Sequence, residues 1–129
     1  MPPIAHLQRP PLIHLQMLER QGVFTTGLFL EVSETRTRRQ YLADQIGATT
    51  NDVNAWRDEA LLLNLAGFGP PEQALFTQAG ILGLAGLISM SLEQLEERID
   101  LAARALGMEP PTELQSRGWW EQAQTLAED

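Results

Sequence analysis

Apolar residues recur every three or four positions along most of this chain, which is the spacing of one face of an α-helix. The clearest stripe consists of Leu92, Leu95, Ile99, Ala102 and Leu106. It starts behind Ser91 in a capping-box sequence, Ser-Leu-Glu-Gln, and Gly107 follows its last residue. Serine satisfies free amides at a helix start, and glycine adopts the left-handed conformation with which many helices end. This segment is therefore predicted to be an amphipathic helix.

Similar start and stop signals cover the rest of the chain. The segment Thr49-Thr50-Asn51-Asp52 offers a helix cap before one apolar run, and a Thr-x-x-Gln box begins at Thr112 behind two prolines. No segment alternates strictly between apolar and polar residues with turn residues at its ends. Residues 23–32, the run richest in β-forming residues, are interpreted as a loop and a short helix. The pattern as a whole predicts an all-α fold.

The helical pattern occurs twice along the chain. Residues 15–23 align with residues 73–81 at an offset of 58, and Arg-x-x-Leu-Ala motifs at Arg39 and Arg98 align at an offset of 59. Duplication with small insertions explains this drift. We expect two tandem units packed as one compact domain. The predicted boundaries are a proline-rich N-terminal arm at residues 1–13, a first unit at 14–58 and a second unit at 59–129.

The composition favours a small cytoplasmic protein. A chain of 129 residues, 43% of them hydrophobic, is long enough to bury a core. It has no cysteine, which excludes disulfides and cysteine-bound metal and suits a reducing compartment. The start of the chain lacks the pattern of a secretory signal. Residues 80–92, the most apolar window, are shorter than the roughly 20 residues that cross a bilayer, so no membrane span is expected.

Charge is divided unevenly between the two halves. Residues 1–57 hold six arginines and five acidic residues, a net charge of +1, whereas residues 58–129 hold three arginines and twelve acidic residues, a net charge of −9. All nine basic residues are arginine, which keeps its charge at physiological pH and binds carboxylates or phosphates through paired hydrogen bonds. An acidic second half favours a basic partner and disfavours a polyanion.

The segment from Leu65 to Gly69, Leu-Ala-Gly-Phe-Gly, precedes a helical stretch that closes on Ala79-Gly80-Ile81 and resembles a helix-hairpin-helix motif. With the two Arg-x-x-Leu-Ala motifs, Trp56 and the terminal Trp-x-x-Gln-Ala, the chain from about His14 to Ala123 is similar to a bacterial family, domain of unknown function 4332. That family is built from tandem helix-hairpin-helix units, and the resemblance implies two such units here. Domains with this motif commonly bind DNA without sequence preference, through hairpin amides and nearby basic side chains.

The exit of this hairpin departs from DNA-binding examples, which usually continue with a basic residue. Here Pro70, Pro71 and Glu72 follow the glycines. Proline has no amide donor, and a carboxylate repels phosphate. We therefore predict that Gly67, Phe68 and Gly69 form a packing turn, with both glycines setting the backbone geometry and Phe68 in the core. Phosphate binding is the alternative. The first unit has Arg9-Pro10-Pro11 in the corresponding place, without glycine.

Arg36, Arg38 and Arg39 form the one basic cluster of the sequence, which Arg57 joins if the fold brings it close. These guanidinium groups are candidates for docking a phosphate or an acidic partner. The alternative is a solvated helix start in which the arginines pair with acidic residues, chiefly with Glu31, Glu34, Asp44 or the acidic second half. In that interpretation Arg39 makes an ion pair within its own unit.

Trp119 and Trp120 are the second candidate site for a partner. Consecutive helical residues point about 100° apart, so the two indoles cannot both face one core. One is expected to pack against the second unit and the other to lie half-exposed, as an anchor for a partner or for a second copy of the chain. The alternative is a tail that folds back over the first unit.

No residues form a recognisable catalytic or metal site. His6 and His14 lack a well-placed carboxylate, and the acidic residues from Glu93 to Asp100 are interpreted as a solvated helix face. We expect no cofactor and no enzymatic activity. The sequence favours a small protein-interaction module or adaptor that binds a protein or itself. The alternative is a nucleic-acid-associated protein that contacts the phosphate backbone through the arginine cluster, which the charge disfavours.

Overall fold

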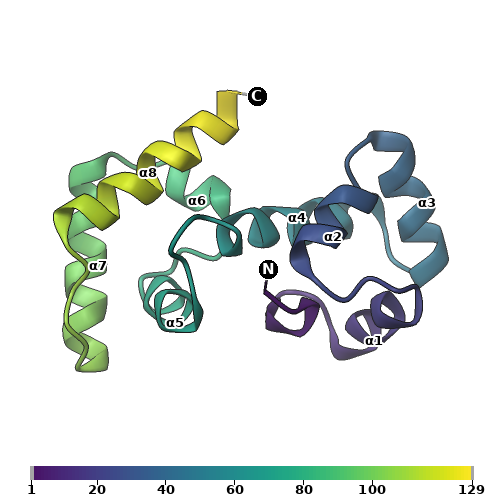
Figure 1. Ribbon diagram of the computed structural model, residues 1–129, viewed down its shortest axis with the longest axis horizontal. Coiled ribbons are helices and arrows are strands. Elements are labelled where there is room, and N and C mark those ends of the chain that lie inside the picture. Colours follow the sequence, from purple (N-terminus) through teal and green to yellow (C-terminus); the bar gives the residue numbers. More distant parts are fainter. Residues whose placement is uncertain (1, 129) are drawn as a thin grey trace. The chain divides into compact units, whose positions relative to one another are not determined.

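The chain folds into helices. The computed structural model describes residues 2–128, and within this range it contains one short 3₁₀ helix and eight α-helices (Figure 1). They are η1 (Ile4–His6), α1 (Leu12–Arg20), α2 (Thr26–Val32), α3 (Arg36–Ile46), α4 (Thr50–Leu63), α5 (Pro70–Gln78), α6 (Leu84–Ile88), α7 (Leu92–Leu106) and α8 (Glu113–Glu128). Pro3 and Thr25 form an isolated β-bridge, and the described part of the chain has no β-strand. The all-α prediction is confirmed.

The helices belong to two compact units, Met1–Asn64 and Leu65–Asp129. The boundary expected between residues 58 and 59 falls inside α4, which continues as one helix to Leu63. Asp58 and Glu59 therefore belong to the first unit. Residues 1–64 hold six arginines and seven acidic residues, a net charge of −1, and residues 65–129 hold three arginines and ten acidic residues, a net charge of −7.

In the first unit, α4 packs against α2 and α3, and α1 packs against α3 and η1. Its core includes Leu18, Phe29, Ile46 and Val53, each at most 1% exposed. Threonine starts three of its helices: the side chains of Thr25, Thr35 and Thr49 each accept a hydrogen bond from an amide in the first helical turn. The cap at Thr49 lies in the segment predicted to start a helix, whereas the caps at Thr25 and Thr35 had not been predicted.

Residues 2–10, part of the predicted arm, pack onto the first unit. The amide of Ile4 donates to the carbonyl of Phe24 at 2.8 Å, and the amide of Thr26 donates to the carbonyl of Pro2 at 3.0 Å. Ile4 and Leu7 are each 2% exposed. The segment therefore contributes to the core of its own unit, and α1 already begins inside the stretch predicted as an arm.

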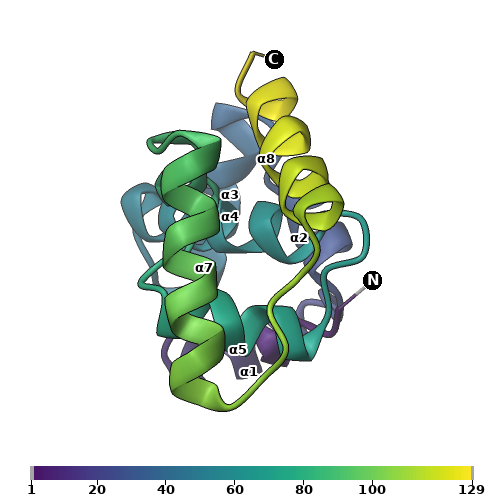
Figure 2. The same cartoon turned by 90° about the vertical axis from the view of Figure 1, so that its left-hand side faces the viewer.

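In the second unit, α7 packs against α5 and α8 (Figure 2). The helix α8 also packs against α6 (Figure 1). Leu95, Ile99 and Ala102 of the predicted stripe are buried on α7, whereas Leu106 in the last turn is 41% exposed. Ser91 starts α7 with the predicted capping box, and Gly107 ends it with a φ of 66°. The sequence signals therefore place this helix correctly at both ends.

The two units have the same order of elements. α1 and α5 begin 58 residues apart, as do α2 and α6, whereas α4 and α8 begin 63 residues apart. α7 has fifteen residues and α3 has eleven. Part of the difference between these offsets therefore arises because the third α-helix is longer in the second unit. The two Arg-x-x-Leu-Ala motifs do not occupy equivalent places, because Leu42 is buried and Leu101 is 65% exposed.

Candidate functional site

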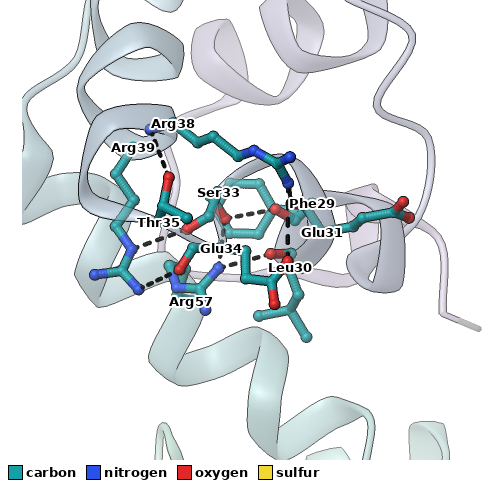
Figure 3. A network of polar contacts seen from close by, with 9 residues as sticks. All are labelled: Phe29, Leu30, Glu31, Ser33, Glu34, Thr35, Arg38, Arg39 and Arg57. Atoms are coloured by element: carbon teal, nitrogen blue, oxygen red, sulfur yellow. Dashed lines mark hydrogen bonds and ion pairs between the residues drawn. The ribbon is translucent and has the colours of Figure 1, made fainter.

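The predicted arginine cluster lies at the turn between α2 and α3 (Figure 3). α2 ends at Val32, and α3 begins at Arg36 behind its cap Thr35. The last carbonyl groups of a helix have no partner within the helix and carry the negative end of its dipole. Cationic donors are therefore favoured at this turn, and three guanidinium groups meet there.

Two of these guanidinium groups come from the first turn of α3. Arg39 donates through Nε to the carbonyl of Ser33 at 2.8 Å and through Nη2 to the carbonyl of Glu34 at 3.0 Å. Arg38 donates through Nη1 to the carbonyl of Glu31 at 3.2 Å and lies 3.8 Å from the carboxylate of Glu34. Arg39 thus holds the turn through backbone carbonyls, where the sequence had suggested an ion pair.

The third guanidinium group comes from the middle of α4. Arg57 Nη1 donates to the carbonyl of Leu30 at 2.9 Å and to Oγ of Ser33 at 2.6 Å, and the fully buried Ser33 hydroxyl donates in turn to the carbonyl of Phe29. Burial, and next the positive charge of Arg39, lower the pKa of Arg57 below its usual value, while the carboxylate of Glu34 opposes the shift. Arg57 therefore joins the cluster as suspected, whereas Arg36 is exposed.

The second unit completes the corresponding turn with neutral donors. Trp120 on α8 donates through its indole Nε1 to the carbonyl of Met90 at 2.9 Å, and Gln124 donates to the carbonyl of Ile88 at 3.3 Å. Trp120 stands seven residues after the start of α8, as Arg57 does in α4. The side chain of Trp120 is half-buried by these contacts.

Trp119 is a core residue. It is 4% exposed, and its ring lies 6.0 Å from that of Phe68 and 5.6 Å from that of Phe76, both in edge-on arrangements. Its indole Nε1 donates to the carbonyl of Ala66 at 3.0 Å. One indole of the pair is thus packed in the second unit and the other is partly exposed, as the helical geometry requires.

Two amides of the glycine hairpin have acceptors within the second unit. The amide of Phe68 donates to the carbonyl of Leu65 at 3.1 Å, and that of Gly69 donates to Oε1 of Glu72 at 2.9 Å. Phe68 is 8% exposed. Pro70 and Pro71, which offer no amide donor, are the first two residues of α5. The carboxylate of Glu72, which was expected to repel phosphate, therefore accepts the amide of the residue that caps α5.

The two glycines of the hairpin have different roles. Gly67 has a φ of 73°, which favours glycine. Gly69 has a φ of −126°, an extended conformation open to other residues, and serves as the N-cap. The prediction that both glycines set an unusual backbone geometry therefore applies to Gly67 alone.

Glu59 is a structural residue that the sequence interpretation missed. It is 4% exposed on α4, and its carboxylate accepts the amides of Gln8 at 2.8 Å and Arg9 at 3.0 Å. The neighbouring Asp58 pairs with the Arg9 side chain at 3.2 Å. A signal was present, because Glu59 stands three residues after Trp56 and four before Leu63, a spacing that places it on the apolar face of the helix. In the second unit Gln122 accepts the amide of Ala66 at 3.0 Å.

An acidic groove lies in the second unit. Its volume is about 330 Å³, and it is lined by Glu96, Glu97, Ile99, Asp100, Pro110, Pro111 and Glu113. Two of its carboxylates have arginine neighbours, since Arg104 lies 3.0 Å from Asp100 and Arg117 lies 3.5 Å from Glu113. Part of the acidic face predicted to be merely solvated is therefore concave, with proline rings and Ile99 between the charges.

Other candidate chemistry is sparse in the part of the chain that the structure describes. Nε2 of His14 lies 3.4 Å from the carbonyl of Gly47, and its ring lies 5.2 Å from that of Trp56. Among residues 2–128 no three histidine or acidic residues are placed to hold a metal ion. No helix in this range combines the length and apolar character needed to cross a membrane.

Comparison with known proteins identifies the family. Residues 13–126 match the family described as domain of unknown function (DUF4332), and the chain belongs to this family. The match covers nearly the whole chain and confirms the resemblance found in the sequence. No curated protein and no solved structure matches the chain.

Proposed function

We propose that this chain is a non-enzymatic protein-interaction module made of two helix-hairpin-helix-like units, and that the second unit binds a basic segment of a partner protein. The shared order of the α-helices supports the duplicated architecture. So does the fact that the last helix of each unit, α4 or α8, donates a hydrogen bond to a carbonyl group near the end of the unit's second α-helix. The lack of cysteine in the sequence is consistent with the cytoplasmic location that we propose.

The acidic groove carries this proposal. Four of its seven lining residues are carboxylates, and the unit around it has a net charge of −7. Arginine or lysine side chains are complementary to such a groove, and the proline rings and Ile99 offer apolar surface to their alkyl stems. The exposed part of the Trp120 side chain is a further contact for the partner in this proposal. Trp119 is not part of the proposed surface, because its indole is buried in the core and donates its hydrogen bond within the second unit.

The alternative, binding to the nucleic-acid backbone, has less support. Arg38, Arg39 and Arg57 are fixed to a single turn of the first unit, so they do not offer the line of cations that follows a backbone. The hairpin amides of Phe68 and Gly69 have intramolecular acceptors. A net charge of −8 also repels a polyanion.

Fluorescence anisotropy with labelled peptides of equal length tests the proposal. We expect an arginine- and lysine-rich peptide to bind the full chain, with affinity falling as salt rises, and an acidic peptide not to bind. The double variant Glu96→Gln/Glu97→Gln should weaken binding by roughly tenfold. The matched control is Glu93→Gln/Glu109→Gln, which removes the same charge outside the groove lining. Equal losses in both variants would refute the groove as the site.

A gel shift with duplex DNA at physiological salt tests the alternative. We expect binding weaker than micromolar. Sub-micromolar affinity that is lost in Arg36→Ala/Arg38→Ala/Arg39→Ala would favour the nucleic-acid function over the protein-binding one. A steep decline of that affinity with salt would identify phosphate contacts as its source.

A further inference from the structure

The arginine turn of the first unit retains unused hydrogen-bond donors. A guanidinium group has five N–H donors. Arg39 uses Nε and one hydrogen of Nη2, and Arg57 uses Nη1 for both of its acceptors. Within residues 2–128, three guanidinium nitrogens of this pair therefore donate no hydrogen bond: Nη1 of Arg39, and Nε and Nη2 of Arg57. The carbonyl contacts fix both groups, so they need little reorganisation to receive a ligand.

The same turn concentrates positive charge. Arg39 and Arg57 are close enough for the charge of one to lower the pKa of the other. The guanidinium group of Arg38 extends to the other side of the turn, toward the carbonyl of Glu31 (Figure 3). The nearest acidic partner is Glu34, whose side chain is 70% exposed and lies 3.8 Å from Arg38. Like charges held together by other contacts repel each other, and a bound anion would relieve that repulsion.

We propose that Arg39 and Arg57 form a binding site for a single phosphate group, presented as free phosphate or as a phosphate monoester. Paired guanidinium groups match the oxygens of a phosphate through parallel hydrogen bonds. Arg36 and Arg38 are both exposed on the first turn of α3. The site occupies one turn, with Glu31 and Glu34 in the same segment, and this favours a compact anion over an extended backbone. It lies in the first unit and does not depend on the proposed function of the second.

The test follows arginine Nε–H signals by NMR in the full ¹⁵N-labelled chain at constant ionic strength. The probes are inorganic phosphate, phenyl phosphate and dimethyl phosphate. We expect saturable shifts at Arg39 and Arg57 with inorganic phosphate, and weaker ones with the singly charged diester. Phenyl phosphate distinguishes the two sources: binding as tight as that of phosphate supports a monoester ligand, and weaker binding supports free phosphate.

Three variants decide the outcome. Arg39→Gln should weaken phosphate binding about tenfold, because it removes a charged donor pair. Glu34→Gln should tighten binding, because it removes the competing carboxylate. Arg104→Gln in the second unit is the control and should have no effect. The proposal is overturned if shifts do not saturate, if Arg39→Gln binds like the unaltered chain, or if dimethyl phosphate and duplex DNA bind as tightly as phosphate.

Discussion

The two units solve one structural problem with different side chains. In each unit, a side chain of the last helix donates a hydrogen bond to a carbonyl group near or just beyond the end of the second α-helix, which is α2 in the first unit and α6 in the second. The first unit uses the guanidinium of Arg57, helped by Arg39 from α3, and the second uses the indole of Trp120. The comparison teaches that the geometry requires a donor but not a charge. The charge at the first turn is therefore available for another purpose.

A second pair of contacts follows the same rule. Glu59 in the first unit and Gln122 in the second accept amides from the segment that precedes the first helix of their unit. Glu59 stands nine residues after the start of α4, and Gln122 stands nine residues after the start of α8. Again one unit uses a charged group where the other uses an amide, so substitutions at paired positions separate geometry from charge.

The largest expected effect concerns the tryptophan at the centre of each unit. Trp119→Ala should lower the free energy of unfolding by about 3–5 kcal/mol, because it empties a buried site between two phenylalanine rings. Trp56→Ala should cost about 1 kcal/mol less, because within residues 2–128 its aromatic partner is a single ring, that of His14. Urea unfolding followed by circular dichroism measures both values. A larger loss for Trp56→Ala would contradict the ranking.

The paired acceptors give the next effect. Glu59→Ala should cost about 1.5–3 kcal/mol, since two amides lose a charged acceptor within the protein. Gln122→Ala should cost about 1 kcal/mol, because it removes a neutral hydrogen bond at a half-exposed position. Hydrogen exchange adds a local readout. The amides of Gln8 and Arg9 should exchange faster in Glu59→Ala, and unchanged rates would show that the carboxylate does not hold this segment.

Gly67 has no glycine counterpart in the first unit, because the aligned position, 58 residues earlier, is Arg9. Gly67→Ala should cost about 1–2 kcal/mol through backbone strain alone, because a Cβ there meets no atom within 4 Å. Gly69→Ala should cost less, because its φ of −126° is open to alanine and the added Cβ, 3.3 Å from Oε1 of Glu72, crowds only the end of a flexible side chain. Thermal melts compare the two variants. If both melt like the unaltered chain while a ligand is lost, the hairpin is a binding site and not a packing turn.

Two arginine substitutions include the smallest expected effect and sharpen the comparison of charge. Arg57→Gln should cost about 1.5 kcal/mol, since it weakens a charge-assisted contact to the end of α2. Arg104→Gln should change stability by less than about 0.5 kcal/mol, because its i,i+4 pair with Asp100 is exposed. The same urea titrations provide the measurement. Equal costs would mean that Arg57 is no more than a surface residue.

The sequence by itself determined the helices and the order of the two units. The caps at Thr49, Ser91 and Thr112 and the glycine after α7 act within one or two helical turns, so residues three or four apart reveal them. The offset of 58 between the hairpin segments was also readable, because it repeats a pattern of side chains. The matching Arg-x-x-Leu-Ala motifs suggested equivalent positions in the two units, but their leucines differ in burial, because identical residue types can occupy different faces of a helix.

The tertiary structure alone decided the partners of the arginines, the choice of Trp119 as the buried indole and the burial of Glu59. The carbonyl of Leu30 and the guanidinium of Arg57 are 27 positions apart, and they meet only because α2 packs against α4. Glu59 reaches amides about 50 residues away in the same manner. Such contacts depend on helix packing, which no local pattern encodes. A charged residue in a sequence therefore does not show whether its charge faces solvent or a helix end.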